Sequence, residues 1–288
     1  MTDIRVLPAP RCDLAEGPAW DPGTQTLTWV DLHAGELHRL RRNDHTCYRF
    51  DPPLSAALPT PDGTLLVGGN QVSLATNVAD PSSVRLLATV PLGAARRCND
   101  AQLDPWGRLW VGTMAPDDPG AAVLYYLDYP GHREDHQESG ATSPTLACAG
   151  LTLANGIGWS SQRDRIYLAD TATRTVLSAP LDDEGRPCGE FAPLLDLGDA
   201  PGVPDGLCVD TAGGIWLAMF GGAQLRCHDP SGPLRDVIEL PVRYPTSAIF
   251  TGPNLDELVV TTARATPTVT DNAALAGRLL TMRPRLPL

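Results

Sequence analysis

The chain has 288 residues, a formal net charge of −12 and a pI near 4.8. This acidity argues against a general nucleic-acid binder, which needs a basic surface, and no apolar run of roughly 18 residues predicts a membrane span. All 22 basic residues are arginine, so mechanisms that need a Schiff-base or P-loop lysine are excluded.

The cysteines and the N-terminal residues indicate the compartment. The seven cysteines are scattered, and no two form a Cys-x-x-Cys pair. This usage predicts reduced, mostly buried thiols rather than a disulfide framework or a zinc knuckle. The first residues carry an acid at position 3 and lack the apolar stretch of a signal peptide. We therefore expect a cytoplasmic protein.

Short apolar runs between Gly, Pro and Asp clusters dominate the chain, and six segments share one pattern of turn residues followed by an alternating strand. In chain order they are WDPGTQTLTWVD, LPTPDGTLLVGG, LDPWGRLWVGT, WSSQRDRIYLAD, VDTAGGIWLAM and FTGPNLDELVVTTA. Their equivalent apolar anchors are Leu27, Leu65, Leu109, Ile166, Ile215 and Leu258, spaced by 38, 44, 57, 49 and 43 residues.

A β-type repeat with this spacing is typical of propeller blades. Solenoid repeats are shorter, and β-sandwiches lack such self-similarity. We predict an all-β fold, a six-bladed β-propeller, as a single domain over residues 1–288 with four short strands per blade. The polar stretch at residues 129–150, between the third and fourth segments, is interpreted as a surface loop or a long hairpin.

A polar residue precedes each anchor by ten or eleven positions. The six are Glu16, Ser55, Asn99, Asn155, Asp205 and Ser247. The strand before each turn lies nearest the axis of a propeller, so equivalent positions are expected to meet at one channel mouth. Asn155-Gly156 and Asp205-Gly206 are also hairpin signals, and a turn is the alternative for each alone. Asp62-Gly63, at the repeat's own turn position, is interpreted as a turn. The shared offset favours the ring.

Such a ring suits a divalent cation. Gathered carboxylates are costly to bury unless they are paired or bound to a metal. Mixed carboxylate and amide oxygens fit Ca²⁺, Mg²⁺ or Mn²⁺, and also Zn²⁺ or Fe²⁺. Arg97 lies two residues before Asn99 and is expected to point the same way, with its guanidinium facing substrate oxygens. Its alternative is an ion pair with an acidic neighbour, and Arg96 should point to the other face.

No histidine falls at a ring position, so a Ser-His-Asp triad or a metal–His cluster has weak support. His33 and His38 are expected on the solvated face of an outer strand. His132 and His136 are expected to be solvated in a polar loop.

Six motifs together carry a family resemblance: LAEGPAW, RRCNDAQLDPWGRLWVGTM, LANGIGWS, DTATRTV, PDGLCVD and VVTTAR. In this order they resemble the SMP-30 (regucalcin), gluconolactonase and sugar lactonase family. The resemblance implies one divalent cation at the axial mouth, held by Glu16, Asn155 and Asp205. It implies that Arg97 binds substrate and that Asn99 is a substrate contact or a further ligand.

The implied reaction is hydrolysis of an aldonolactone, such as glucono-, xylono- or arabinolactone, to the aldonic acid. Asp205 is the best candidate to accept the proton of the attacking water. The APDDPGAAVLYYL stretch after Met114 lacks a clear counterpart of an acidic substrate-binding residue found in some members, which leaves the sugar preference open. Two alternatives remain: a propeller hydrolase of other lactones or phosphotriesters, and a non-catalytic calcium-binding protein.

Overall fold

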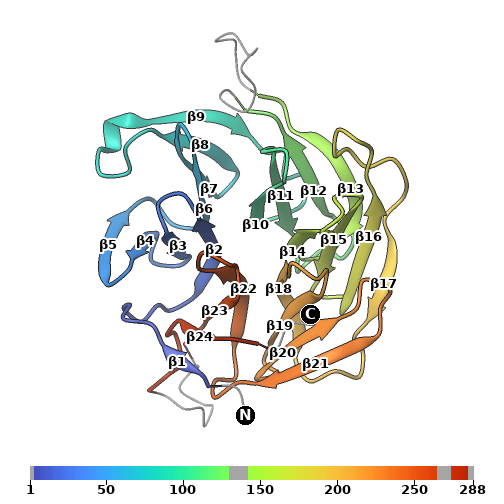
Figure 1. The fold of residues 1–288 in the computed structure, drawn as a ribbon. Coiled ribbons are helices and arrows are strands. Elements are labelled where there is room, and N and C mark those ends of the chain that lie inside the picture. The colour runs from blue at the N-terminus through green and yellow to red at the C-terminus, as the bar shows by residue number, and fades with distance from the viewer. Residues whose placement is uncertain (1–2, 130–141, 265–273, 285–288) are drawn as a thin grey trace.

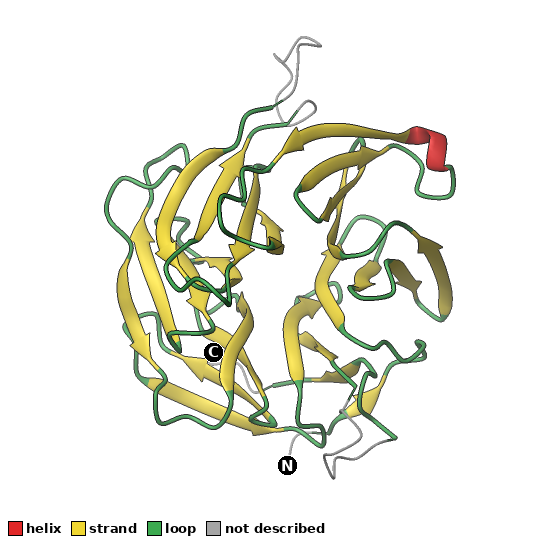
Figure 2. Ribbon diagram, turned by 180° about the vertical axis from the view of Figure 1, so that it is seen from behind, coloured by secondary structure: helices red, strands yellow, loops and turns green. Residues whose placement is uncertain are grey.

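The structure, a computed structural model, describes residues 3–129, 142–264 and 274–284. It confirms the six-bladed β-propeller: six four-stranded antiparallel sheets surround a central axis (Figure 1). One short 3-10 helix, η1 (Pro81–Ser83), lies at the outer edge of the ring of sheets (Figure 2). No helix in the described ranges has the length and apolarity of a membrane span. All seven cysteines are free thiols, as predicted, but the expectation that most are buried is wrong, because only Cys12, Cys98 and Cys227 are buried.

Each blade runs outward from the axis in chain order. Blade 1 holds β2 (Ala15–Asp21), β3 (Thr26–Asp31), β4 (Glu36–Arg41) and β5 (Asp44–Arg49). Blade 2 holds β6 (Leu54–Thr60), β7 (Gly63–Gly68), β8 (Gln71–Ala75) and β9 (Val84–Thr89). Blade 3 holds β10 (Arg97–Leu103), β11 (Leu109–Met114), β12 (Ala122–Leu127) and β13 (Thr145–Leu151).

The second half repeats the plan and then closes the ring. Blade 4 holds β14 (Ala154–Trp159), β15 (Arg165–Asp170), β16 (Thr175–Pro180) and β17 (Ala192–Asp196). Blade 5 holds β18 (Val203–Val209), β19 (Ile215–Phe220), β20 (Gln224–His228) and β21 (Leu234–Glu239). Blade 6 holds β22 (Pro245–Thr251), β23 (Glu257–Thr262) and β24 (Leu280–Met282), and its outer strand is β1 (Arg5–Val6) from the N-terminal end. The two ends of the chain therefore complete one sheet, which ties the ring shut.

Buried aspartates shape the turn after the inner strand in two blades. In the β18–β19 turn, Oδ1 of Asp210 accepts the N–H groups of Ala212 and Gly214, both at 2.8 Å. Its Oδ2 accepts the indole N–H of Trp216, also at 2.8 Å. Asp104 accepts the equivalent three groups in blade 3. This arrangement makes residues 210–214 the true reversal of blade 5.

Apolar side chains between neighbouring blades hold the inner strands in place. All six repeat anchors lie on the second strand of a blade and are at most 3% exposed. Between blades 2 and 3, for example, Leu65 and Val67 pack with Leu109 and Val111. Truncating a buried leucine of this kind to alanine costs about 2–5 kcal/mol. The axis is therefore lined by a rigid backbone frame on which polar side chains can be fixed.

Candidate functional site

The six predicted ring residues lie on the six inner strands, which surround the axis in Figure 1 (β2, β6, β10, β14, β18 and β22). The strand pairing is irregular at the same place in every one. The irregularities fall at Glu16/Ala19, Leu54/Ala56, Cys98/Ala101, Ala154/Ile157, Pro204/Leu207 and Pro245/Ser247. A bulge bends its strand and re-aims the side chains beside it. The positions that share an offset in the sequence therefore lie at or beside the places where the strand pairing is irregular.

Side chains at or beside these irregularities bond across to the next blade. Three such bonds are Ser55 Oγ to Cys98 O at 3.0 Å, Asn99 Nδ2 to Ala154 O at 3.0 Å, and Thr246 Oγ1 to Ala15 O at 2.6 Å. Each gives a backbone carbonyl near the irregular pairing a side-chain hydrogen bond from the neighbouring blade. The same bonds fix the orientation of the polar groups around the axis.

Asn155 and Asp205 are in direct contact. Asp205 is 6% exposed and Asn155 is 7% exposed. The amide Nδ2 of Asn155 donates to Oδ1 of Asp205 and, at 3.1 Å, to Oγ1 of Thr171. Because the amide nitrogen is engaged twice, the amide oxygen of Asn155 is the atom that a cation would use.

The turn alternative for Asp205-Gly206 is wrong, because both residues lie inside β18. A Cβ on Gly206 would overlap the side chain of Ser247 on the next blade. A Cβ on Gly156 would meet the backbone of Asp205 and Leu207. The two glycines therefore allow neighbouring inner strands to approach closely at the ring. Gly63 begins β7 opposite Thr60, so Asp62-Gly63 is the turn that the repeat predicted.

Three carboxyl groups share the site. Burial raises the pKa of Glu16, and the carboxylates of Asp205 and Asp100 raise it further. Burial also raises the pKa of Asp205, and Asp100 adds to this effect. The pKa of Asp100 rises to about 6 through burial, although the N–H of Ala101 donates to its carboxylate at 2.8 Å. The carboxylate of Asp100 therefore makes both Glu16 and Asp205 harder to ionise, whereas burial is what raises the pKa of Asp100 itself.

Arg97 brings a positive charge to this site. Its guanidinium lowers the pKa of Glu16, which places the two groups within electrostatic reach of each other. Burial lowers the pKa of Arg97, and Glu16 opposes that shift. The Nη1 atom donates to Cys98 O at 2.8 Å and to Ser55 Oγ at 3.4 Å. Arg96 is instead exposed and forms an ion pair with Asp117.

The donor set fits a divalent cation. Three carboxyl groups against one guanidinium leave the site negative when it ionises, and such burial is unfavourable unless the charge is compensated. Carboxylates of Glu16 and Asp205 with the amide oxygen of Asn155 are the oxygen ligands that hard cations prefer. A bound cation would also reverse the raised pKa values, because it favours the ionised carboxylates.

The histidine predictions are corrected in one case. His33 is exposed, but it lies in the turn after β3. The prediction that His38 lies on a solvated face is wrong, because it is 2% exposed and stacks on Trp29 with ring centroids 5.1 Å apart. The ring also stacks on His45, with centroids 5.3 Å apart, so aromatic neighbours within blade 1 cover it. His132 and His136 lie outside the described residues.

A cavity of about 560 Å³ lies away from the axis, between blades 1 and 2. Its lining includes Arg39, Arg41, Tyr48 and Thr64, and no ring residue. The candidate site is therefore assigned from converging charge at the axis and not from cavity volume.

Comparison with known sequences identifies the family of the chain. Residues 14–264 match the SMP-30/Gluconolactonase/LRE-like region. The chain belongs to this family.

Members of the family with related sequences act on sugar lactones. The chain is 32% identical over 267 residues to the pentonolactonase XacC of Haloferax volcanii, covering 91% of this chain and 86% of that protein. It is 32% identical over 258 residues to the 6-deoxy-6-sulfogluconolactonase of Pseudomonas putida, covering 87% and 84%. The crystal structure of the calcium-binding protein regucalcin from Agrobacterium tumefaciens has a TM-score of 0.84 at 26% identity, covering 99% of this chain and 96% of that one.

The sequence analysis did not identify two residues of the candidate site in this member of the SMP-30/gluconolactonase family. Asp100 stands beside Asn99 in β10, where strict alternation would turn it away from the axis. The irregularity between Cys98 and Ala101 leaves both polar residues without ladder partners. Thr171 holds the amide of Asn155 from the end of the next strand. The consecutive polar residues Asn99 and Asp100 inside one strand were the available signal for Asp100.

Proposed function

We propose that this protein hydrolyses a sugar (aldono) lactone, of the glucono-, xylono- or arabinolactone type, to the aldonic acid with the help of a divalent cation. The observation that carries the proposal is the gathering of Glu16, Asp100 and Asp205 at the propeller axis. The pentonolactonase and sulfogluconolactonase relatives support the substrate class.

Glu16, Asn155 and Asp205 would hold the cation, which is Ca²⁺, Zn²⁺, Mn²⁺, Mg²⁺ or Fe²⁺. A regucalcin described as calcium-binding is among the similar structures, which supports a divalent ion. When bound, the cation would polarise the lactone carbonyl and stabilise the negative charge that develops on its oxygen.

Asp205 is the proposed general base. The amide of Asn155 engages its Oδ1, which leaves Oδ2 to accept the proton of the attacking water. A bound cation would keep Asp205 ionised, so that its carboxylate is able to accept the proton. Asn155 thus has two roles: it offers its oxygen to the cation and orients the base.

Arg97 and Asn99 are proposed to orient the sugar. The Nδ2 group of Asn99 is bonded to Ala154 O, so its oxygen would accept a substrate hydroxyl. Nη1 of Arg97 is anchored on Cys98 O, and its Nη2 and Nε would donate to sugar oxygens. Fixing the guanidinium through one nitrogen limits the freedom it loses on binding.

The test measures lactone opening with a pH indicator after chelation and addition of each candidate cation. Glucono-, xylono- and arabinolactone are compared, with spontaneous hydrolysis subtracted. We expect Asp205→Ala to lower kcat/KM by about 100-fold or more, since it removes a ligand and the base. Asp62→Ala is the matched control, because it changes the same Asp-Gly dipeptide in an exposed turn and should keep activity within about twofold.

Three results would overturn the proposal. Unchanged activity of Asp205→Ala would remove both roles of that residue. Turnover of phosphotriesters or apolar lactones without sugar lactones would favour the other hydrolase reading. Calcium binding without turnover of any substrate would favour the non-catalytic one.

A further inference from the structure

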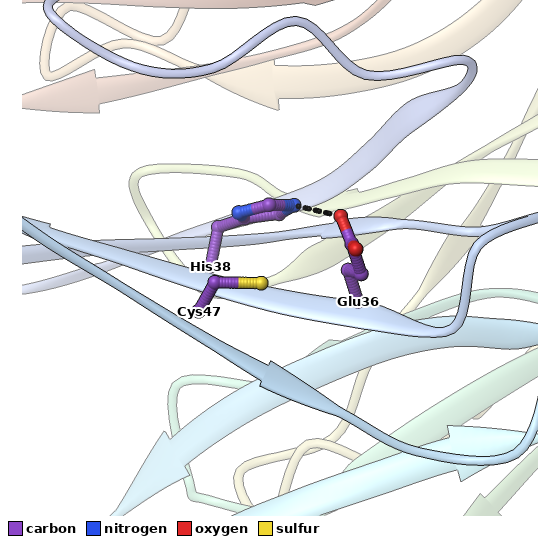
Figure 3. A group of neighbouring side chains, drawn as sticks. All are labelled: Glu36, His38 and Cys47. Atoms are coloured by element: carbon purple, nitrogen blue, oxygen red, sulfur yellow. Dashed lines mark ion pairs between the residues drawn. The ribbon is translucent and has the colours of Figure 1, made fainter.

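A second group of metal-ligating side chains lies on the outer strands of blade 1, far along the sheet from the inner strand that carries Glu16. Glu36 and His38 are on β4, and Cys47 is on β5 (Figure 3). His38 and Cys47 are directly paired across the two strands. One carboxylate oxygen, one imidazole nitrogen and the Sγ atom all lie within 4.8 Å of one another. The three side chains therefore converge on one point.

His38 directs an unsatisfied nitrogen into this group. The side chain is 2% exposed, and burial lowers its pKa, so the ring is held neutral. Nε2 has no hydrogen-bond partner among the described residues, and it lies 3.4 Å from Oε2 of Glu36 (Figure 3). A buried polar atom without a hydrogen bond is unfavourable, and a metal ion would supply the missing partner.

The neighbouring side chains already hold two of the ligands in a binding orientation. Nδ1 of His38 lies 3.1 Å from Nε2 of His45. When Nδ1–H donates to His45, the lone pair of His38 Nε2 points into the group. Nη2 of Arg49 donates to Oε1 of Glu36 at 2.6 Å, which leaves Oε2 facing His38. Metal-binding histidines and carboxylates are characteristically fixed through their second atoms in this way.

The spacing fits a tetrahedral ion of zinc size. Bonds of about 2.0–2.1 Å to nitrogen and oxygen place two tetrahedral ligands about 3.3–3.4 Å apart. The observed distance between His38 Nε2 and Glu36 Oε2 is 3.4 Å. A sulfur at about 2.3 Å from the ion would lie about 3.6 Å from each of these atoms. Cys47 is exposed on an outer strand, so rotation of its side chain can bring Sγ to this distance from the other two ligand atoms.

We infer that Glu36, His38 and Cys47 bind one Zn²⁺ or a similar borderline divalent ion, with a fourth position open to solvent. Thiolate and imidazole ligands select such ions, whereas the oxygen ligands at the axis suit harder ones. Binding converts the Cys47 thiol, whose pKa burial and Glu36 raise, to the thiolate and releases its proton. The chain thus has two metal sites of different chemical preference.

Cobalt(II) is the probe, because a cobalt–thiolate bond gives an intense near-ultraviolet charge-transfer band. The axial ring residues include no cysteine, so this band reports only the outer site. We expect the wild-type protein to develop the band to a stoichiometry of one ion and to lose it when Zn²⁺ is added. Cys47→Ser should abolish the band, and Glu36→Gln should weaken cobalt binding at least about tenfold.

Two controls keep the result interpretable. Cys188→Ser removes another exposed cysteine and should leave the band unchanged. Asp205→Ala should also retain it, so loss of the proposed lactonase activity does not affect this test. Absence of the band in the wild type, or an equal band in Cys47→Ser, would overturn the inference. Loss of the band in Cys188→Ser would show adventitious thiol binding and overturn it as well.

Discussion

The charge of Asp100 is expected to destabilise the protein when no cation is bound. Its carboxyl has a pKa of about 6 in the folded chain against an ordinary value of 3.8. The folded state therefore holds the proton more tightly than the unfolded state, and stability falls as the pH rises from about 3.8 through about 6. Asp100→Asn removes this loss while keeping the size of the side chain.

The magnitude follows from the two pKa values. One pKa unit corresponds to about 1.4 kcal/mol, so the ionised Asp100 costs about 3 kcal/mol at pH 7 and about 1 kcal/mol at pH 4.5. The amide carries one more N–H donor than the protonated carboxyl, and burying that donor without a partner costs about 1 kcal/mol at both pH values. Asp100→Asn should therefore stabilise the cation-free protein by about 2 kcal/mol at pH 7 and by about zero at pH 4.5.

Urea unfolding in the presence of a chelator, followed by tryptophan fluorescence, measures this difference. The two proteins should be compared at pH 4.5 and pH 7 and again at pH 7 with saturating Ca²⁺. The cation neutralises the cluster, so it should reduce the advantage of the variant. An equal stability change at both pH values would refute the reasoning, since it would show that ionisation of Asp100 carries no penalty.

Three further predictions concern the same site. Gly206→Ala should lower the free energy of unfolding by about 1–3 kcal/mol, because the added Cβ overlaps Ser247. Urea titration measures the change, and Gly23→Ala, in an exposed turn, is the control. Cation affinity should fall at least about tenfold between pH 7 and pH 5, since protons compete for carboxyls such as Asp100 with its pKa of about 6; calorimetry that finds equal affinities would contradict this. Arg97→Lys should raise KM for the lactone about tenfold with little change in kcat, and a fall in kcat alone would exclude a substrate-binding role.

The six-bladed fold was predictable because the same local sequence pattern occurs once in every blade. Each repeats a turn followed by an alternating apolar strand, and the spacing of anchors such as Leu27 and Leu65 is visible without coordinates. The closure of blade 6 by β1 was not visible, because Arg5 and Val6 form only a two-residue strand whose partner lies at the other end of the chain. Two exposed residues carry no repeat pattern of their own.

The repeat pattern was enough to predict that the candidate ligands lie on inner strands. Glu16, Asn155 and Asp205 precede their anchors by ten or eleven residues, and this offset falls in the inner strand of each blade. Which other groups join them depends on strand pairing and packing that the sequence pattern does not show. Asp100 reaches the cluster because an irregular pairing cancels the alternation of β10. His38 became a buried candidate ligand because its ring packs against those of Trp29 and His45, a contact that the alternation of β4 alone does not encode.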